Sequence, residues 1–190
     1  DDKLEVEKLK NKSDDTVRVI KPDSLDKEGV KTSYDNFEID LEKLTGSSSQ
    51  KRLVEFPSGQ YQKLTVSSKE GRAEFSSVSK NSLKKVCCNL ESRLKDKTSL
   101  FLYMGEVSQG EQLHLKKKLK GNTIKSKFFS ISDENFDFEL LTVSLKYSGE
   151  ADEKYKIYRY DEEERIFKAL ETKLDSLTKR AVALSDKGGI

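Results

Sequence analysis

The 190-residue chain contains no tryptophan, one methionine, two prolines, two cysteines and one histidine. Cys87 and Cys88 are adjacent, and adjacent cysteines bridge each other only through a strained ring because their Cα atoms lie about 3.8 Å apart. We therefore expect no disulfide framework, which fits either a reducing compartment or a secreted protein that does not depend on disulfides. His114 is the single histidine, so the usual Cys/His zinc spacings cannot be assembled, and we expect no metal site and no cofactor.

Long hydrophobic runs are also absent. The longest apolar clusters are short, such as residues 100–104, whereas a membrane-spanning helix needs about 20 apolar residues. The sequence therefore predicts no transmembrane span. The chain opens with Asp1 and shows neither an initiator methionine nor an apolar signal segment. This opening indicates a processed or trimmed chain, and it leaves the native compartment open.

Apolar residues are scarce and charged residues are abundant. Hydrophobic residues make up 34% of the chain, against roughly 45–50% in an average globular domain when glycine is counted. Charged residues make up 37%, yet the formal net charge is only +2. A large core is excluded. The length permits one domain, or two small domains that share a sheet or an interface.

Many short segments alternate between apolar and polar residues, which is typical of strands with one buried face. The pattern predicts strands over residues 17–20, 37–41, 52–56, 61–66, 71–77, 99–104, 113–119 and 127–131. Pro57 and Gly59 predict a turn that joins the strands 52–56 and 61–66 in a hairpin. The alternation changes phase between Leu140 and Leu141, which predicts a β-bulge or a bend there.

Two segments have the spacing of an amphipathic helix. In the first, expected to be helical over about 82–95, apolar residues recur at three- and four-residue steps: Leu83, Cys87, Leu90 and Leu94. In the second, similar steps run from Ile166 to Leu184 and predict a helix over about 162–184, with Asp161 as its N-cap. Alternatively, the acidic stretch 161–164 is the tip of a hairpin between the segments 155–160 and 165–170. The helix is the preferred interpretation.

These expectations describe an α+β protein with antiparallel β-meander sheets and two amphipathic helices. A polar N-terminal arm (residues 1–29) precedes two segments, 30–95 and 98–185, each expected to form a β-meander closed by a helix. The two segments are either two halves of one compact body or two small domains. The order of strands and helix in each segment resembles the outline of a PH-like module, and no motif of a particular family is matched.

No motif with a specific catalytic mechanism is present. The sequence lacks the glycine-rich phosphate loops G-x-G-x-x-G and G-x-x-x-x-G-K-[ST], the nucleophile motif G-x-S-x-G and the zinc motif H-E-x-x-H. His114 lies between Leu113 and Leu115, where alternation predicts an exposed position on a strand. We therefore expect no catalytic residues and no enzyme activity, and an enzyme of unknown class is the minority alternative.

The distribution of charge is more informative than its total. The net charge is −4 over residues 1–45, +10 over residues 46–127 and −4 over residues 128–190. The densest basic stretch flanks a turn signal at Gly121 and Asn122 and supplies the anion-binding candidates Lys116, Lys117, Lys118, Lys120, Lys125 and Lys127. On a hairpin tip these lysines would converge on phosphoinositide headgroups or another polyanion. The alternative is a solvated strand edge, which lysines protect from aggregation. Sequence-specific binding of nucleic acid is not favoured, because the stretch has no arginine and no interleaved aromatics.

A second candidate site contains three tyrosines and an arginine: Tyr155, Tyr158, Arg159 and Tyr160. Exposed tyrosine beside arginine is typical of protein-interface anchors, whereas the alternative is that these rings cover the end of a sheet. The sequence thus predicts a non-catalytic protein–protein interaction or binding module, either a component of an assembly or the ectodomain of a secreted surface protein. The alternative function is a PH-like domain that binds an anionic ligand through residues 116–127.

Overall fold

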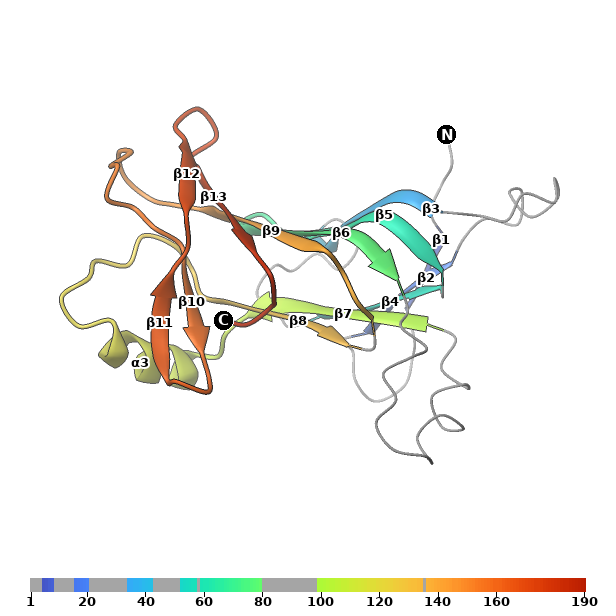
Figure 1. Ribbon diagram of the computed structural model, residues 1–190, viewed down its shortest axis with the longest axis horizontal. Coiled ribbons are helices and arrows are strands. Elements are labelled where there is room, and N and C mark those ends of the chain that lie inside the picture. Colours follow the sequence, from blue (N-terminus) through green and yellow to red (C-terminus); the bar gives the residue numbers. More distant parts are fainter. Residues whose placement is uncertain are drawn as a thin grey trace, which may run out of the picture.

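The computed structural model describes residues 5–8, 16–20, 34–42, 52–57, 59–79, 99–134 and 136–190, and these residues form two facing β-sheets. The five-stranded sheet has the order β1 (Glu5–Lys8), β2 (Thr16–Ile20), β4 (Arg52–Pro57), β7 (Ser99–Glu106) and β8 (Phe129–Glu134). The six-stranded sheet has the order β12 (Thr172–Asp175), β13 (Arg180–Ser185), β9 (Leu140–Lys146), β6 (Gly71–Ser79), β5 (Gln60–Ser67) and β3 (Tyr34–Asp40). A separate hairpin, β10 (Tyr158–Asp161) and β11 (Ile166–Ala169), and the helix α3 (Gln109–Lys118) lie at one end of the two sheets (Figure 1).

The main core fills the space between the two sheets, because alternate side chains of each strand point inward. The five-stranded sheet contributes side chains that include Val54, Phe56, Leu100, Leu102 and Met104, and the six-stranded sheet contributes Leu64, Val66, Ala73, Phe75 and Leu141. Phe75 also packs edge-to-face on Phe136 and Phe138, with ring centroids 5.4 and 4.8 Å apart. The described residues thus form a two-layer β-sandwich with a modest core.

Several predicted strands are confirmed, but the predicted hairpin is wrong. The strands expected over 17–20, 37–41, 52–56, 61–66, 71–77 and 99–104 correspond to β2, β3, β4, β5, β6 and β7. However, β4 pairs with β2 and β7, whereas β5 pairs with β3 and β6. The connection around Gly59 carries the chain from one sheet to the other, and both strands face the core from opposite sides. Two pairs, β2–β4 and β3–β5, are parallel, so the sheets are not simple meanders.

Of the β-bulge or bend expected near Leu140 and Leu141, a bend is present at Glu139, while the pairs Ser76↔Leu140 and Ser79↔Asp137 keep one register without an extra residue. Phe136 on one side of this point and Leu141 and Val143 on the other all pack into the main core, so the side-chain alternation changes phase there. In the partner strand Ser77 has a positive φ of 52° at the same level of the ladder. Both strands therefore shift phase together, which keeps their apolar residues inside.

The helix predicted over 162–184 is wrong, because this segment contains β11, β12 and β13. The hairpin alternative describes it correctly: β10 pairs with β11, and the chain turns at residues 162–165. Asp161 is a cap, but it caps a turn, since its Oδ1 accepts hydrogen bonds from the backbone N–H groups of Glu163 and Glu164 at 3.1 Å each. The spaced apolar residues do not form one buried face: Ile166 and Leu177 are 48% and 95% exposed, whereas Leu170, Leu174 and Ala181 pack in a hydrophobic cluster.

A helix was not expected over residues 109–118, where α3 lies in place of the predicted strand 113–119. The Ser108 side chain accepts a hydrogen bond from the backbone N–H of Glu111 at 3.4 Å, which is the first half of a capping box. Lys116, Lys117 and Lys118 occupy the last turn, where positive charge stabilises the helix dipole. The apparent Leu113/Leu115 alternation misled the prediction, since only Leu115 is buried.

The structure confirms the predicted mainly-β α+β class, but it does not confirm the two predicted helices. The helix expected over 82–95 lies outside the described residues. The C-terminal segment is β-structure, so the PH-like outline, which requires a C-terminal helix, does not describe the segment 98–185. Each of the two large sheets contains strands from both segments, 30–95 and 98–185. In the described part of the chain, no helix has the length and apolar character needed to cross a membrane.

Candidate functional site

A cavity of about 200 Å³ lies where the main core meets a second, smaller hydrophobic cluster. The main core contributes Phe129, Ile131, Leu141 and Val143 to its walls, and the second cluster contributes Tyr147, Ile157 and Ala181. All seven side chains are buried. The floor of the cavity is therefore apolar and belongs to both sheets.

Three connecting segments surround this floor at the end of the sandwich that carries α3 and the β10–β11 hairpin (Figure 1). They are the segment after α3 (residues 119–128), the segment between β9 and β10 (residues 147–157) and the residues after β13 (186–190). The first two are joined, because the backbone N–H of Ser148 donates to the carbonyl oxygen of Lys125 at 2.8 Å. The cavity is thus built from parts of the chain that are distant in sequence.

The residues after β13 close one side of the cavity. Gly189 and Ile131 exchange two backbone hydrogen bonds of 2.7 and 2.8 Å, and the N–H of Tyr160 donates to the carbonyl oxygen of Ile190 at 2.7 Å. Gly188 fits here because it has no side chain: a Cβ at this position would overlap the carbonyl oxygen of Ile131. This contact attaches the segment both to the edge of the five-stranded sheet and to the β10–β11 hairpin.

The polar part of the cavity lining is of one charge sign. Six basic residues belong to it: Lys125, Lys127, Lys154, Lys156, Arg159 and Lys187. Among the residues that the structure describes, no aspartate or glutamate lines the cavity. Because four of these lysines are exposed while the apolar walls are buried, the basic groups lie around the mouth and the apolar groups lie within. The site is therefore electropositive outside and apolar inside.

These basic groups differ in their partners. Lys127 pairs with Glu106 at 3.0 Å, and Arg159 pairs with Asp186 at 2.8 Å. The Arg159 ion pair holds the pKa of the Asp186 carboxyl below its ordinary value, chiefly through the hydrogen bond from the guanidinium. Within the described part of the chain, Lys125 has no carboxylate partner. Its charge is therefore not neutralised by a carboxylate of the described residues.

Lys125 and Tyr155, which both line the cavity, bring two hydrogen-bond donors close together. The Lys125 Nζ and the Tyr155 hydroxyl oxygen lie 3.7 and 3.8 Å from the same point, the position that a Cβ on Gly149 would occupy. Nζ also lies over the Tyr155 ring, 5.9 Å from its centroid, and Tyr147 packs edge-to-face on that ring. Both side chains are half-buried, so the pair is held in place by its surroundings.

The structure divides the six lysines that the sequence grouped as one anion-binding candidate. Lys116, Lys117, Lys118 and Lys120 lie in or just after the last turn of α3, are exposed, and do not line the cavity. Lys125 and Lys127 lie further along the segment and do line it. The segment is not a hairpin tip, so the lysines do not converge as expected.

The tyrosine cluster is also divided. Tyr155, Tyr158 and Arg159 line the cavity, whereas Tyr160 packs on Phe167 with ring centroids 5.1 Å apart. Of the four residues, Tyr158 is the one classed as exposed, with 38% of its surface accessible. The two groups that the sequence treated as separate therefore meet at Lys118 and Tyr160, where Nζ lies 5.7 Å from the ring centroid, and at Lys125 and Tyr155. No local pattern could have revealed this, because at least thirty positions of sequence separate the two residues of each pair.

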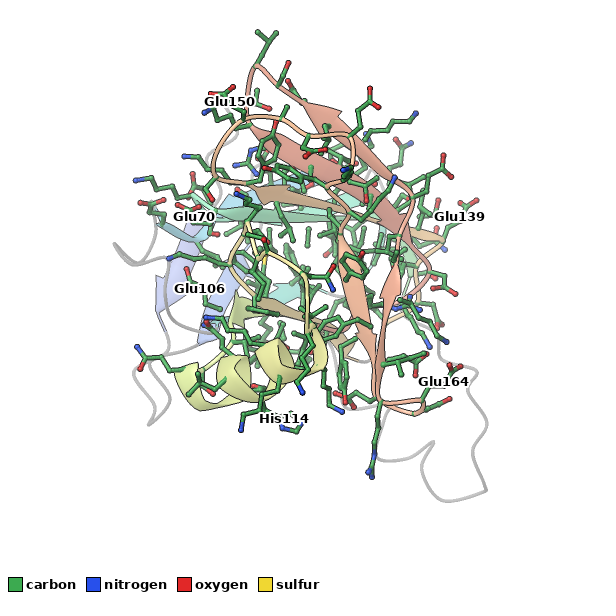
Figure 2. The ribbon with its side chains drawn as sticks, turned by 90° about the vertical axis from the view of Figure 1, so that its left-hand side faces the viewer. Glu70, Glu106, His114, Glu139, Glu150 and Glu164 are labelled. Atoms are coloured by element: carbon green, nitrogen blue, oxygen red, sulfur yellow. The ribbon has the colours of Figure 1, made fainter. Side chains whose placement is uncertain are left out.

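Other titratable groups gather away from this cavity, at Glu38, Arg72 and Glu74 on the six-stranded sheet. In the end view of Figure 2, Glu106, His114, Glu139, Glu150 and Glu164 lie apart from one another around the periphery. The searched, described residues contain no group of three or more histidine, cysteine, aspartate or glutamate side chains that could hold a metal ion. Cys87 and Cys88 lie outside the described residues.

Comparison of the chain with protein-family models, with curated proteins and with solved structures finds no match. What the protein binds must therefore be inferred from the geometry and chemistry of the cavity.

Proposed function

We propose that this protein is a non-catalytic binding module and that its ligand site is the cavity at the end of the sandwich. The observation that carries the proposal is the apolar floor, where two hydrophobic clusters leave a space of about 200 Å³ between them. An engineered apolar cavity of about 150 Å³ stays dry and binds benzene. A cavity of similar size that opens to solvent offers an apolar ligand the same gain from leaving water.

The arrangement of reactive groups supports binding rather than catalysis. His114 is exposed on α3 and does not line the cavity. An activated nucleophile typically lies within hydrogen-bond distance of a base that a third group orients. The cavity instead presents apolar walls and basic groups around its mouth, which are features of recognition.

The test is the binding of N-phenylnaphthylamine, a neutral fluorophore that becomes bright in apolar surroundings. We expect saturable binding of one molecule per chain. Ala181→Leu, which places a larger side chain in the cavity wall, should weaken binding at least tenfold. The matched control is Ala169→Leu, the same exchange at an exposed β11 position that does not line the cavity, and it should leave binding unchanged.

Two results would contradict the proposal. One is the absence of saturable fluorophore binding to the folded protein. The other is equal binding by the Ala181→Leu variant, provided that its circular dichroism spectrum and thermal transition show a folded chain. In either case the cavity would not be a ligand site.

A protein contact is the second candidate function, and exposed apolar side chains at the same end favour it. Tyr158, Ile166 and Leu184 are 38%, 48% and 55% exposed on β10, β11 and β13. Tyrosine in such a position is typical of interface anchors. A partner captured by the intact protein at low and at high salt, and lost with Tyr158→Ala, would support this function. A partner lost only at high salt would argue for the basic groups instead.

A further inference from the structure

We propose that the ligand of the cavity is a medium-chain carboxylate, with its carboxylate at Lys125 and Tyr155 and its acyl chain on the apolar floor. This inference rests on the proposed function, since it specifies the chemistry of the ligand that the cavity binds. It follows from three features: the charge of the lining, the position of two donors and the size of the cavity.

The charge of the lining selects an anion. Six basic groups and, within the described residues, no aspartate or glutamate line the cavity. Two of these cations are already paired, Lys127 with Glu106 and Arg159 with Asp186, although the buried Nε–H of Arg159 has no acceptor among the described residues. Field lines concentrate where charges of one sign border a medium of low dielectric constant. An anionic ligand is therefore favoured over a neutral one, and a cationic ligand is disfavoured.

The position of the carboxylate follows from two donors that have no hydrogen-bond acceptor among the described residues. In the described part of the chain, neither the Lys125 ammonium nor the Tyr155 hydroxyl has a carboxylate or hydrogen-bond acceptor as its partner. Both groups lie within 4 Å of the Cβ position of Gly149, so they can donate to one group of atoms. A carboxylate accepts from both, and hydrogen bonds between charged groups are about twice as strong as neutral ones. Tyr155 would fix the orientation of the carboxylate while Lys125 supplies the charge.

The size of the cavity limits the chain. The space of about 200 Å³ is a little larger than the cavity of about 150 Å³ that accommodates benzene. Each methylene that leaves water should raise the affinity about fourfold, equivalent to about 0.8 kcal/mol. This gain should end once the chain fills the cavity. Affinity should therefore rise from hexanoate to decanoate and then level off toward hexadecanoate.

A headgroup with several phosphates fits the structure less well. Such a group requires several unpaired cations that converge, but Lys127 and Arg159 of the cavity lining are paired with carboxylates. Four of the six lysines in the basic stretch lie on or just after α3, away from the lining. A single carboxylate needs only the Lys125 and Tyr155 donors. The observations therefore favour a single-chain carboxylate.

The test compares three ligands with the same chain: decanoate, decanol and decylamine. Each displaces N-phenylnaphthylamine from the intact protein, at low and at high salt. Decanoate should bind about tenfold more tightly than decanol, since a hydrogen bond to a charged group is involved. Decylamine should bind most weakly. High salt should reduce the difference in affinity between decanoate and decanol, because salt screens charges at a mouth that is exposed to solvent.

Variants then locate the carboxylate. Lys125→Met keeps an apolar stem of similar length without the charge, and it should bring decanoate to the affinity of decanol. Tyr155→Phe should weaken the binding of decanoate but not that of decanol or decylamine. The control is Lys120→Met, because Lys120 is an exposed lysine of the same segment and does not line the cavity. This variant should keep the preference for decanoate over decanol.

The outcomes separate this inference from the proposed function. If decanol binds as tightly as decanoate, or if decylamine does, the carboxylate inference is overturned while the cavity remains a ligand site. Retention of the preference by both Lys125→Met and Tyr155→Phe overturns the assigned position. If the fluorophore itself does not bind, both the inference and the proposed function fail.

Discussion

Asp161 shows how one side chain determines a local structure. Its Oδ1 accepts two backbone N–H groups of the β10–β11 turn, and its Oδ2 lies 2.8 Å from the Nζ of Lys168. The hydrogen bond from Lys168, with that from the backbone of Glu164, lowers the pKa of the Asp161 carboxyl from 3.8 to about 2. The ionised form is therefore the form that stabilises the hairpin.

This pKa predicts how stability depends on pH. Because the folded-state pKa is depressed, the contribution of Asp161 is complete above about pH 4 and is lost as the pH falls toward 2. Asp161→Asn should lower the free energy of unfolding at neutral pH and flatten its decline below pH 4, as measured by urea titration. Glu162→Gln, an exchange at an exposed position of the same turn, is the control. An unchanged pH profile for Asp161→Asn would contradict the assignment.

Replacement of glycine by alanine should have opposite effects on stability at two positions. A Cβ on Gly188 would overlap the Ile131 carbonyl oxygen, so Gly188→Ala should destabilise the protein by about 1–3 kcal/mol, the usual range for overpacking. No atom lies within 4 Å of a Cβ on Gly110 in α3, so Gly110→Ala should stabilise the helix by up to about 1 kcal/mol. Urea unfolding measures both. Equal effects of the two variants would show that the C-terminal contact is not formed in solution.

At the scale of elements, the β10–β11 and β12–β13 hairpins use the same turn chemistry. Asp161 and Asp175 each accept hydrogen bonds from backbone N–H groups two and three residues later. Arg165 and Lys179, each four residues after its aspartate, have positive φ values of 57° and 53°. A short turn built in this way reverses the chain, and it explains why residues 158–185 form strands in spite of their helical spacing.

The positive φ of Arg165 predicts a stabilising substitution. The left-handed conformation raises the energy of a residue other than glycine by about 1–2 kcal/mol. Glycine avoids this strain, but it loses more conformational entropy on folding than other residues. Arg165→Gly should therefore raise the free energy of unfolding by about 0.5–1 kcal/mol. Glu163→Gly, in the same turn but without a positive φ, should lower it. Thermal and urea unfolding of the two variants give the comparison, and a loss of stability with Arg165→Gly would mean that the turn has another conformation.

At the scale of the whole molecule, the sandwich and its cavity depend on the same contacts. The walls of the cavity belong to both hydrophobic clusters, so a ligand seated there contacts both sheets and the connecting segments. A ligand that binds only the folded state raises the free energy of unfolding by mass action. Binding and global stability are thereby linked.

This linkage predicts a thermal shift. Decanoate at one hundred times its dissociation constant should add about 2.7 kcal/mol to the free energy of unfolding, visible as a higher midpoint temperature. Decylamine at the same concentration, and decanoate with the Ala181→Leu variant, should give no comparable shift. A shift of the same size with all three would indicate unspecific binding of amphiphiles.

The amino-acid sequence determined the strand-rich class and much of the local chemistry. Alternation located β3, β6 and β7, because a strand with one buried face must alternate whatever its partner is. The capping signals at Ser108 and Asp161 were also present in the sequence, because they act over three or four residues. The excess of positive charge between residues 46 and 127 was visible for the same reason, since it requires only counting.

Only the tertiary structure decided the strand partners, the secondary structure of residues 162–184 and the position of the proposed ligand site. Alternation specifies the face of a strand but not its hydrogen-bond partner, so β4 and β5 looked like a hairpin although they lie in different sheets. Apolar steps of three and four residues fit a helix and, by coincidence, three short strands. Lys125 and Tyr155 lie side by side because two connecting segments meet at the end of the sandwich. Contacts of this kind depend on the closure of the whole fold, and no short stretch of sequence encodes them.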